Sequence, residues 1–209
     1  MTAAGRSLDL WRANEGTATA CLRHPFLRGI ADGTLPRNRF LFYVGQDAFY
    51  LDAYARAYAL ALAKAPDGEA MQGFRELLDG ALGERALHRG YAERWGADLN
   101  PRPAPATLAY TDFLLRVAWS EPAGHIAAAM TPCMRLYAHL GQSLQADTRT
   151  TSPYAEWVRT YADGAFELLA RRLEGLLDRL DDGTVTTADH YRQAMRLELA
   201  FFEAAWQGQ

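Results

Sequence analysis

One carboxylate interrupts a row of tyrosines in the segment 36–65. The row comprises Tyr43, Asp47, Tyr50 and Tyr54. Their spacings of four, three and four residues place them on one face of a helix. Such a row usually belongs to a hydrophobic core, but a carboxylate within it must be paired or face a wet cavity, because burying it alone costs several kcal/mol. The row therefore predicts either a core with a paired Asp47 or a pocket for a flat, polar ring.

A cysteine directly follows a proline in the apolar segment 122–147. Pro132 lacks a backbone N–H and is expected to kink a helix there, which would present Cys133 into a cavity. A free cysteine is more often buried as a small hydrophobic side chain, and this segment alone favours that interpretation. The other cysteine, Cys21, is expected in the core.

A glutamate lies on the apolar face of the last helical segment. It is Glu198, followed at three, four and eight residues by Phe201, Phe202 and Trp206. A carboxyl group removed from water has a raised pKa and can serve as a general acid. The alternative is a salt bridge to one of the chain's many arginines.

The sequence contains no residue spacing that is typical of a metal or phosphate site. His88 and His125 each follow a glutamate by four residues, whereas di-iron bundles use Glu-x-x-His pairs. The two cysteines are far apart, and no glycine-rich loop follows a strand. We therefore predict free thiols, no metal ion and no cofactor.

The composition indicates which elements position these side chains. Of 209 residues, 38 are Ala and 28 are Leu, but only 4 are Val and 2 are Ile. Strands prefer branched and aromatic side chains, whereas Ala and Leu favour helices. We expect an all-α, single-domain bundle of seven to eight helices between clusters of Pro, Gly and Asp. The expected ranges are about 7–23, 25–32, 36–65, 67–96, 104–120, 122–147, 153–180 and 185–207.

Charge and hydropathy exclude several classes of protein. The formal net charge is −3, so no overall basic field attracts nucleic acid or an acidic membrane. No apolar run reaches the ~20 residues of a membrane span, and no apolar signal segment follows Met1. We expect a cytoplasmic protein with no nucleic-acid or membrane partner.

Two stretches near the start carry the most specific pattern of the chain. Residues 24–36 read HPFLRGIADGTLP, and residues 43–51 read YVGQDAFYL. Both strongly resemble the TenA family, also called thiaminase II. Shorter matches follow in the family's order and span nearly the whole chain. They are 86–89, 107–110, Pro132-Cys133 with Tyr137, Trp157 with Tyr161, and Glu198 with Phe201-Phe202.

The resemblance implies a fold, an assembly and an activity. Family members have an all-α, haem-oxygenase-like fold and form homotetramers, so residues 1–209 are expected to be one TenA-like helical domain. Members hydrolyse 4-amino-5-aminomethyl-2-methylpyrimidine, a thiamin breakdown product, to the hydroxymethyl pyrimidine, and many also cleave thiamin. The expected function is that of an aminopyrimidine aminohydrolase in thiamin salvage.

The resemblance also implies roles for individual residues. Cys133 would be the nucleophile that adds to the pyrimidine ring, and Glu198 would protonate the ring nitrogen. Tyr50 would assist the thiol, and Asp47 would bind the aminopyrimidine edge. The other implied pocket residues are Tyr110, Tyr137, Tyr161 and Phe201.

Two other classes of function remain open at this point. One is an oxidative enzyme on the same fold, resembling the pyrroloquinoline quinone synthases, which would need a pocket rich in His and Arg. The other is a transcriptional regulator, which the acidic net charge and the lack of a basic recognition helix do not favour.

Overall fold

The computed structural model is helical, as the composition predicts. It describes residues 5–208, without the side chains of residues 86–88 and 91, so His88 lies outside the described side chains. This part of the chain contains no strand. The helices are α1 (Arg6–Ala13), α2 (Glu15–Arg23), α3 (Pro25–Asp32), α4 (Arg37–Ala63), α5 (Gly68–Trp95), α6 (Pro105–Ser120), α7 (Ala123–Gln145), α8 (Ala155–Ala162), α9 (Gly164–Leu180) and α10 (Val185–Gln207).

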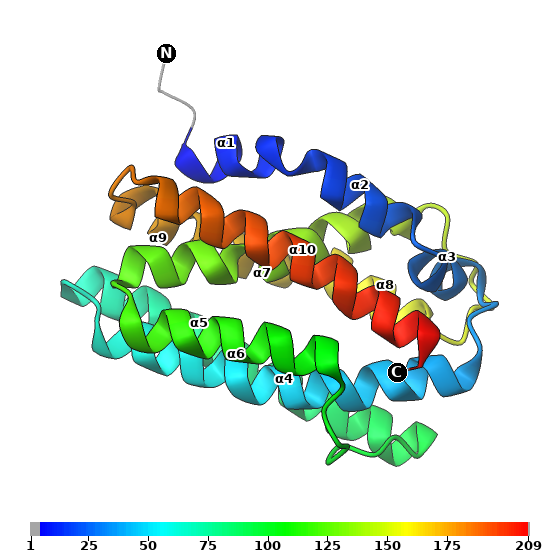
Figure 1. Cartoon of the computed structure of the whole chain (residues 1–209). Helices are drawn as coiled ribbons and strands as arrows, with labels where there is room; N and C mark the ends of the chain where they lie inside the picture. Colours follow the sequence, from blue (N-terminus) through cyan, green and yellow to red (C-terminus); the bar gives the residue numbers. More distant parts are fainter. Residues whose placement is uncertain (1–4, 209) are drawn as a thin grey trace.

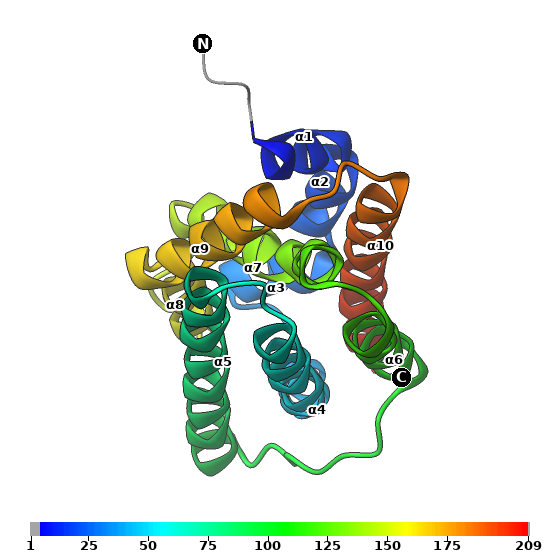
Figure 2. The same ribbon diagram turned by 90° about the vertical axis from the view of Figure 1, so that its left-hand side faces the viewer.

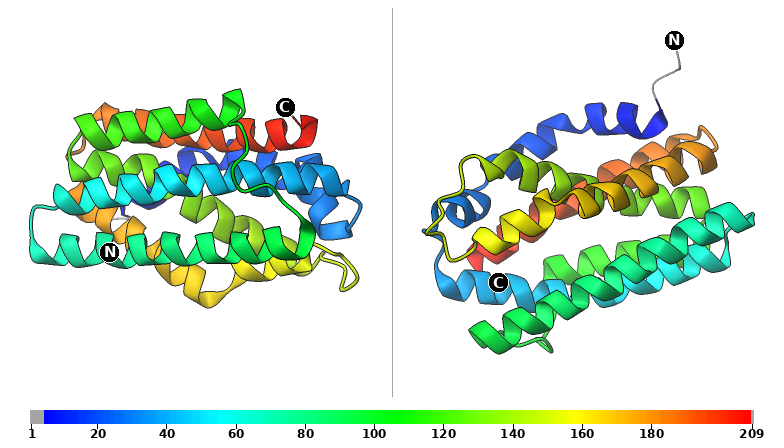
Figure 3. Two further views of the ribbon diagram at one scale, coloured as in Figure 1. Left: turned by 90° about the horizontal axis from the view of Figure 1, so that it is seen from below. Right: turned by 180° about the vertical axis from the view of Figure 1, so that it is seen from behind.

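The helices pack in layers around α7 (Figures 1 and 2). One layer places α4 between α5 and α6, side by side in the view from below (Figure 3). The next places α7 between α9 and α10, with α8 against α7. Helices α1 and α2 cover the far side of this second layer. The facing sides of the two main layers therefore enclose the side chains of α4, α6, α7 and α10.

Two expected helices are each divided, so the expected number of seven to eight is too low. The segment 7–23 breaks at Asn14, whose side-chain amide donates to the Leu10 carbonyl at 2.8 Å. The segment 153–180 breaks at Asp163, whose backbone is extended and whose carboxylate accepts from Ala165 N at 2.8 Å. Asn and Asp favour such positions because their side chains compete for backbone hydrogen bonds. The apolar periodicity continues across both breaks and hides them.

Two glycines bring α7 into direct backbone contact with its neighbours. A Cβ atom at Gly124 would collide with the main chain of Leu180 at the end of α9. A Cβ atom at Gly141 would collide with the main chain of Tyr161 and Ala162 in α8. Backbone atoms cannot rotate away as a flexible side chain can. The two contacts hold α7 close to α8 and α9. Helix α7 continues through Pro132 without a break.

The described helices give no candidate for a membrane-spanning segment, because none combines the necessary length with sufficient apolar character.

Candidate active site

Every tyrosine whose side chain is described is buried. They are Tyr43, Tyr50, Tyr54, Tyr58, Tyr110, Tyr137, Tyr154, Tyr161 and Tyr191. A buried hydroxyl group normally needs a hydrogen-bond partner, so this many tyrosines indicate a polar network inside the bundle. Most of them lie on α4, α6, α7 and α8, where those helices face one another.

The acid expected on α10 is bonded to a tyrosine of α6. Glu198 is only 2% exposed, and Tyr110 donates its hydroxyl to Glu198 Oε1 at 2.7 Å. Burial raises the pKa of Glu198 to about 8, and the negative charge of Asp47 adds to this. The Tyr110 hydrogen bond and the neighbouring Cys133 thiol oppose the rise. Among the described residues Glu198 makes no ion pair with an arginine, so the salt-bridge alternative is wrong.

The cysteine of α7 lies beside this acid. Burial raises the pKa of the Cys133 thiol well above its usual value, and the charge of Glu198 raises it further. The nearby Tyr50 hydroxyl acts in the opposite direction and lowers the pKa of the thiol. The structure thus brings Cys133, Glu198 and Tyr50 together from three helices. Cys21 is completely buried, as expected for a core residue.

Asp47 lies within this group of residues on the buried side of α4. It is 4% exposed, and its charge raises the pKa of Glu198 and also contributes to the raised pKa of Tyr137. Of the two interpretations of the tyrosine row, the structure favours a polar site, because the row faces a glutamate and a cysteine.

Aromatic rings form the walls around these polar groups. The Tyr50 ring centroid lies 4.8 Å from that of Tyr110 and 6.1 Å from that of Phe201. On the other side, the ring centroids of Tyr137 and Tyr161 are 4.8 Å apart in an edge-on arrangement. All the residues that the sequence predicts for the site therefore lie in one cluster.

Hydrogen bonds between helices extend the network beyond what the sequence pattern predicts. Trp157 Nε1 donates to the Tyr43 hydroxyl at 3.2 Å, and that hydroxyl donates to Tyr137 at 3.3 Å. Tyr161 donates its hydroxyl to Glu84 Oε1 at 2.5 Å. These bonds join α4, α5, α7 and α8, and residue spacing within one helix cannot reveal contacts between helices.

A cavity of about 620 Å³ adjoins the cluster between α4, α5, α8 and α9. Its lining includes Tyr54, Glu84, Met134 and Phe166, but neither Cys133 nor Glu198. The hydrogen bond from Tyr161 to Glu84 connects this lining to the aromatic wall of the site. The cavity is therefore a neighbour of the cysteine–glutamate pair and does not contain it.

Comparison with known proteins identifies the family. The model of the TENA/THI-4/PQQC family matches residues 11–208. The chain belongs to this family. The TenA resemblance found from the sequence is thereby confirmed.

Two relatives illustrate the range of proteins that contain such a chain. The aminopyrimidine aminohydrolase of Halalkalibacterium halodurans is 38% identical over 162 residues, which cover 74% of this chain and 72% of that protein. The thiamine biosynthesis multifunctional protein ThiED of Corynebacterium efficiens is 34% identical over 203 residues. These residues cover 94% of this chain but only 28% of ThiED, so the chain corresponds to a minor part of the multifunctional relative.

Solved structures support the fold. A TenA family transcription regulator from Silicibacter sp. TM1040 superposes with a TM-score of 0.89 at 28% identity, covering 97% of each chain. A domain with a heme oxygenase-like fold from Shewanella denitrificans OS217 gives a TM-score of 0.74 at 14% identity, covering 95% of this chain and 92% of that one. The expected haem-oxygenase-like fold is confirmed.

Proposed function

We propose that this TenA-family chain is an aminopyrimidine aminohydrolase that acts in thiamin salvage. The observation that carries the proposal is the pairing of the Cys133 thiol with a buried Glu198 whose pKa is raised to about 8. The similarity to a relative named aminopyrimidine aminohydrolase supports the same activity. The proposed substrate is 4-amino-5-aminomethyl-2-methylpyrimidine, with thiamin as a second candidate.

The raised pKa suits Glu198 to the role of proton donor. Near neutral pH the carboxyl group is mostly protonated, so it can give its proton to a ring nitrogen of the bound pyrimidine. A neutral aminopyrimidine is a poor electrophile, and protonation makes its ring carbon open to attack by the Cys133 sulfur. Tyr50 assists this attack because its hydroxyl stabilises the thiolate.

The covalent adduct allows the amino group on the side chain to leave. Electrons from the adduct expel the amino group from the aminomethyl carbon, and it leaves as ammonia with the proton that the Cys133 thiol released on attack. Water then adds to that carbon, its proton returns to the sulfur, and the Cys133 thiol departs from the ring. The product is the hydroxymethyl pyrimidine, and Glu198 regains its proton when the ring nitrogen loses one. The reaction consumes one water molecule and releases one ammonia, so it needs no cofactor.

Binding of a flat, polar ring is assigned to the surrounding side chains. Asp47 is proposed to accept hydrogen bonds from the aminopyrimidine edge, because it is buried next to the acid–thiol pair. Tyr110 and Phe201 supply ring faces, and Tyr137 and Tyr161 complete the pocket.

A product assay by mass tests the proposal. Purified protein is incubated with the aminomethyl pyrimidine and, separately, with thiamin, and the hydroxymethyl pyrimidine is quantified. We expect Cys133→Ala to reduce kcat/KM by at least about 10³-fold while the helical circular dichroism is retained. Cys21→Ala, a matched change at the completely buried cysteine, is expected to keep activity. Full activity of Cys133→Ala would refute the covalent mechanism, and no product with either substrate would refute the function.

The assembly and the location of the protein belong to the same proposal. A homotetramer is implied by the family resemblance, and sedimentation velocity measures it. A cytoplasmic location and the lack of nucleic-acid partners are part of the proposal, and the formal net charge of −3 supports the second. A DNA-binding titration at increasing salt tests the regulator alternative, because real binding weakens steeply with salt.

A further inference from the structure

A group of metal-binding side chains lies where α6 ends and where α7 and α10 begin. It comprises Glu121, His125 and His190, and one ligand atom of each lies within 4.8 Å of the others. His125 Nδ1 lies 3.0 Å from Glu121 Oε2. Two ligands of one tetrahedral zinc ion lie about 3.3 Å apart, given the usual metal–ligand distances. Small side-chain movements would therefore bring all three ligand atoms to one ion.

His190 provides an independent observation that points to a ligand. Its side chain is only 9% exposed, and its Nε2 has no hydrogen-bond partner among the described residues. A neutral imidazole has one nitrogen with a free lone pair, which can bind a metal ion. A buried polar atom without a partner is unfavourable, and a metal ion would satisfy it. Ring contacts with Phe113 and His125, at centroid distances of 5.9 and 5.8 Å, hold His190 in place.

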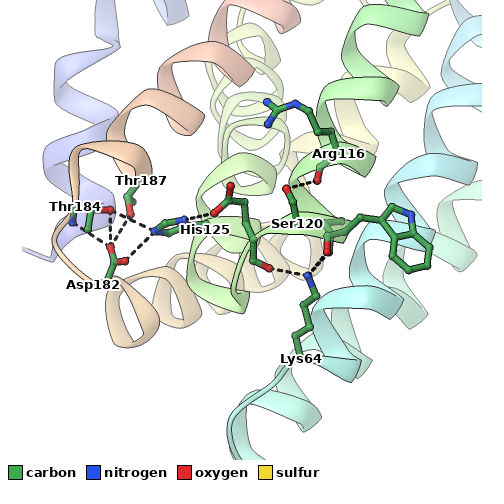
Figure 4. A network of polar contacts seen from close by, with 10 residues as sticks. Lys64, Arg116, Ser120, His125, Asp182, Thr184 and Thr187 are labelled. Atoms are coloured by element: carbon green, nitrogen blue, oxygen red, sulfur yellow. Dashed lines mark hydrogen bonds and ion pairs between the residues drawn. The ribbon is translucent and has the colours of Figure 1, made fainter.

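The second histidine is oriented in the way that metal-bound histidines usually are. His125 Nε2 lies 3.0 Å from Asp182 Oδ2, while Nδ1 faces Glu121 (Figure 4). Thr184 donates its hydroxyl to the other oxygen of Asp182 at 2.7 Å and fixes the carboxylate. A histidine that binds a metal through one nitrogen commonly donates the other N–H to a carboxylate. Asp182 therefore holds the ring through Nε2, and an ion bound to Nδ1 would replace the hydrogen bond between Nδ1 and Glu121.

The backbone of the carboxylate ligand is anchored by a lysine. Lys64 Nζ donates to the carbonyl oxygens of Ala118, Trp119 and Glu121, each at 2.8 Å (Figure 4). The carbonyls of Ala118 and Trp119 belong to the last turn of α6 and that of Glu121 comes directly after it, where the helix offers no backbone partner. The Glu121 side chain remains 29% exposed, so an ion can reach the group from solvent.

We propose that Glu121, His125 and His190 bind one divalent transition-metal ion, best fitted by zinc. Two imidazole nitrogens and one carboxylate oxygen are a typical zinc donor set with a fourth position for water, whereas magnesium and calcium prefer oxygen ligands. The ion joins the ends of α6, α7 and α10. The expectation of no metal rested on spacing within one helix, and these ligands come from different helices.

The metal group is separate from the candidate active site and does not depend on the proposed function. His125 lies eight positions before Cys133 on α7, and His190 lies eight positions before Glu198 on α10. This spacing corresponds to about 12 Å along each helix.

Equilibrium dialysis of the untagged protein against zinc chloride, after removal of metals with EDTA, tests the proposal. We expect one zinc per chain by mass spectrometry and no binding of magnesium at the same concentration. Glu121→Gln and His190→Gln should each weaken zinc binding at least about tenfold, as should Asp182→Asn through the orientation of His125. Zinc at about a hundredfold excess over its dissociation constant should raise Tm by roughly 5 °C.

Matched variants separate this group from other zinc-binding side chains. His139→Gln changes a histidine of α7 outside the group and should still bind one zinc per chain. Cys133→Ser should also bind one zinc per chain, because no thiol belongs to the proposed ligand set. Circular dichroism verifies the fold of His190→Gln, and the partly exposed Glu121 gives an independent result if that variant fails to fold. No zinc bound to wild type at tens of micromolar, or full affinity in Glu121→Gln, would overturn the proposal.

Discussion

The raised pKa of Glu198 predicts a stability that falls with pH. Its value of about 8 in the folded protein compares with 4.5 in the unfolded chain, chiefly because the carboxylate is removed from water. Between these values the folded state keeps a proton that the unfolded state releases, so the free energy of unfolding decreases as pH rises. The full pKa difference corresponds to a loss of at most roughly 5 kcal/mol in the free energy of unfolding. This loss is complete only above about pH 8.

Glu198→Gln removes this titration and keeps an oxygen that can accept the Tyr110 hydrogen bond. Between pH 5 and 9 the free energy of unfolding of wild type should fall by several kcal/mol because of Glu198. That of Glu198→Gln should not fall for this reason, because glutamine does not titrate. At about 2 °C per kcal/mol for a chain of this size, the difference in Tm should change by up to about 10 °C. Urea unfolding monitored by fluorescence at a series of pH values measures it directly.

A change at an exposed glutamate serves as the control. The Glu69 side chain is 77% exposed, and Glu69→Gln should follow the wild-type pH dependence closely. If wild type and Glu198→Gln instead lose stability in parallel between pH 5 and 9, Glu198 is ionised in the folded protein across that range. That result would refute both the raised pKa and the role of Glu198 as proton donor.

Two further predictions follow from the site and from the packing of α7. Asp47→Asn removes a negative charge that raises the pKa of Glu198, so the alkaline limit of kcat should move to lower pH; a pH–rate profile with an unmoved limit would show that the two groups are not coupled. Gly141→Ala forces a methyl group against the main chain of α8 and should lower the free energy of unfolding in urea by about 3 kcal/mol. Gly175→Ala, with open space around it, should leave that free energy unchanged or raise it. Equal stabilities of the two variants would contradict the close contact at Gly141.

The sequence predicts the helices well where composition and chain breakers agree. The expected range 25–32 coincides with α3, and 185–207 coincides with α10. The breaks at Asn14 and Asp163 are missed, because a single side chain that caps the backbone decides each of them within an uninterrupted apolar pattern. Local hydrogen bonds of this kind leave no periodic signal.

The site is predictable in its residue types but not in its contacts. Asp47, Cys133 and Glu198 stand out because polar or reactive side chains interrupt apolar helix faces. The partner of Glu198 could not be chosen from the sequence, since both an arginine and a tyrosine were available; the packing of α6 against α10 selects Tyr110. The bond between Tyr161 and Glu84 depends in the same way on how distant helices pack.

The two glycine contacts of α7 have a consequence for how this enzyme scaffold can be redesigned. Because Gly124 and Gly141 place α7 directly against the main chain of its neighbours near both of its ends, the Cys133 side chain that it carries has little freedom to move. Substrate range would then have to be varied through the walls that α4, α6, α8 and α10 contribute. A mutant library directed at those walls, with both glycines kept, can search new ligand shapes without displacing the Cys133 sulfur.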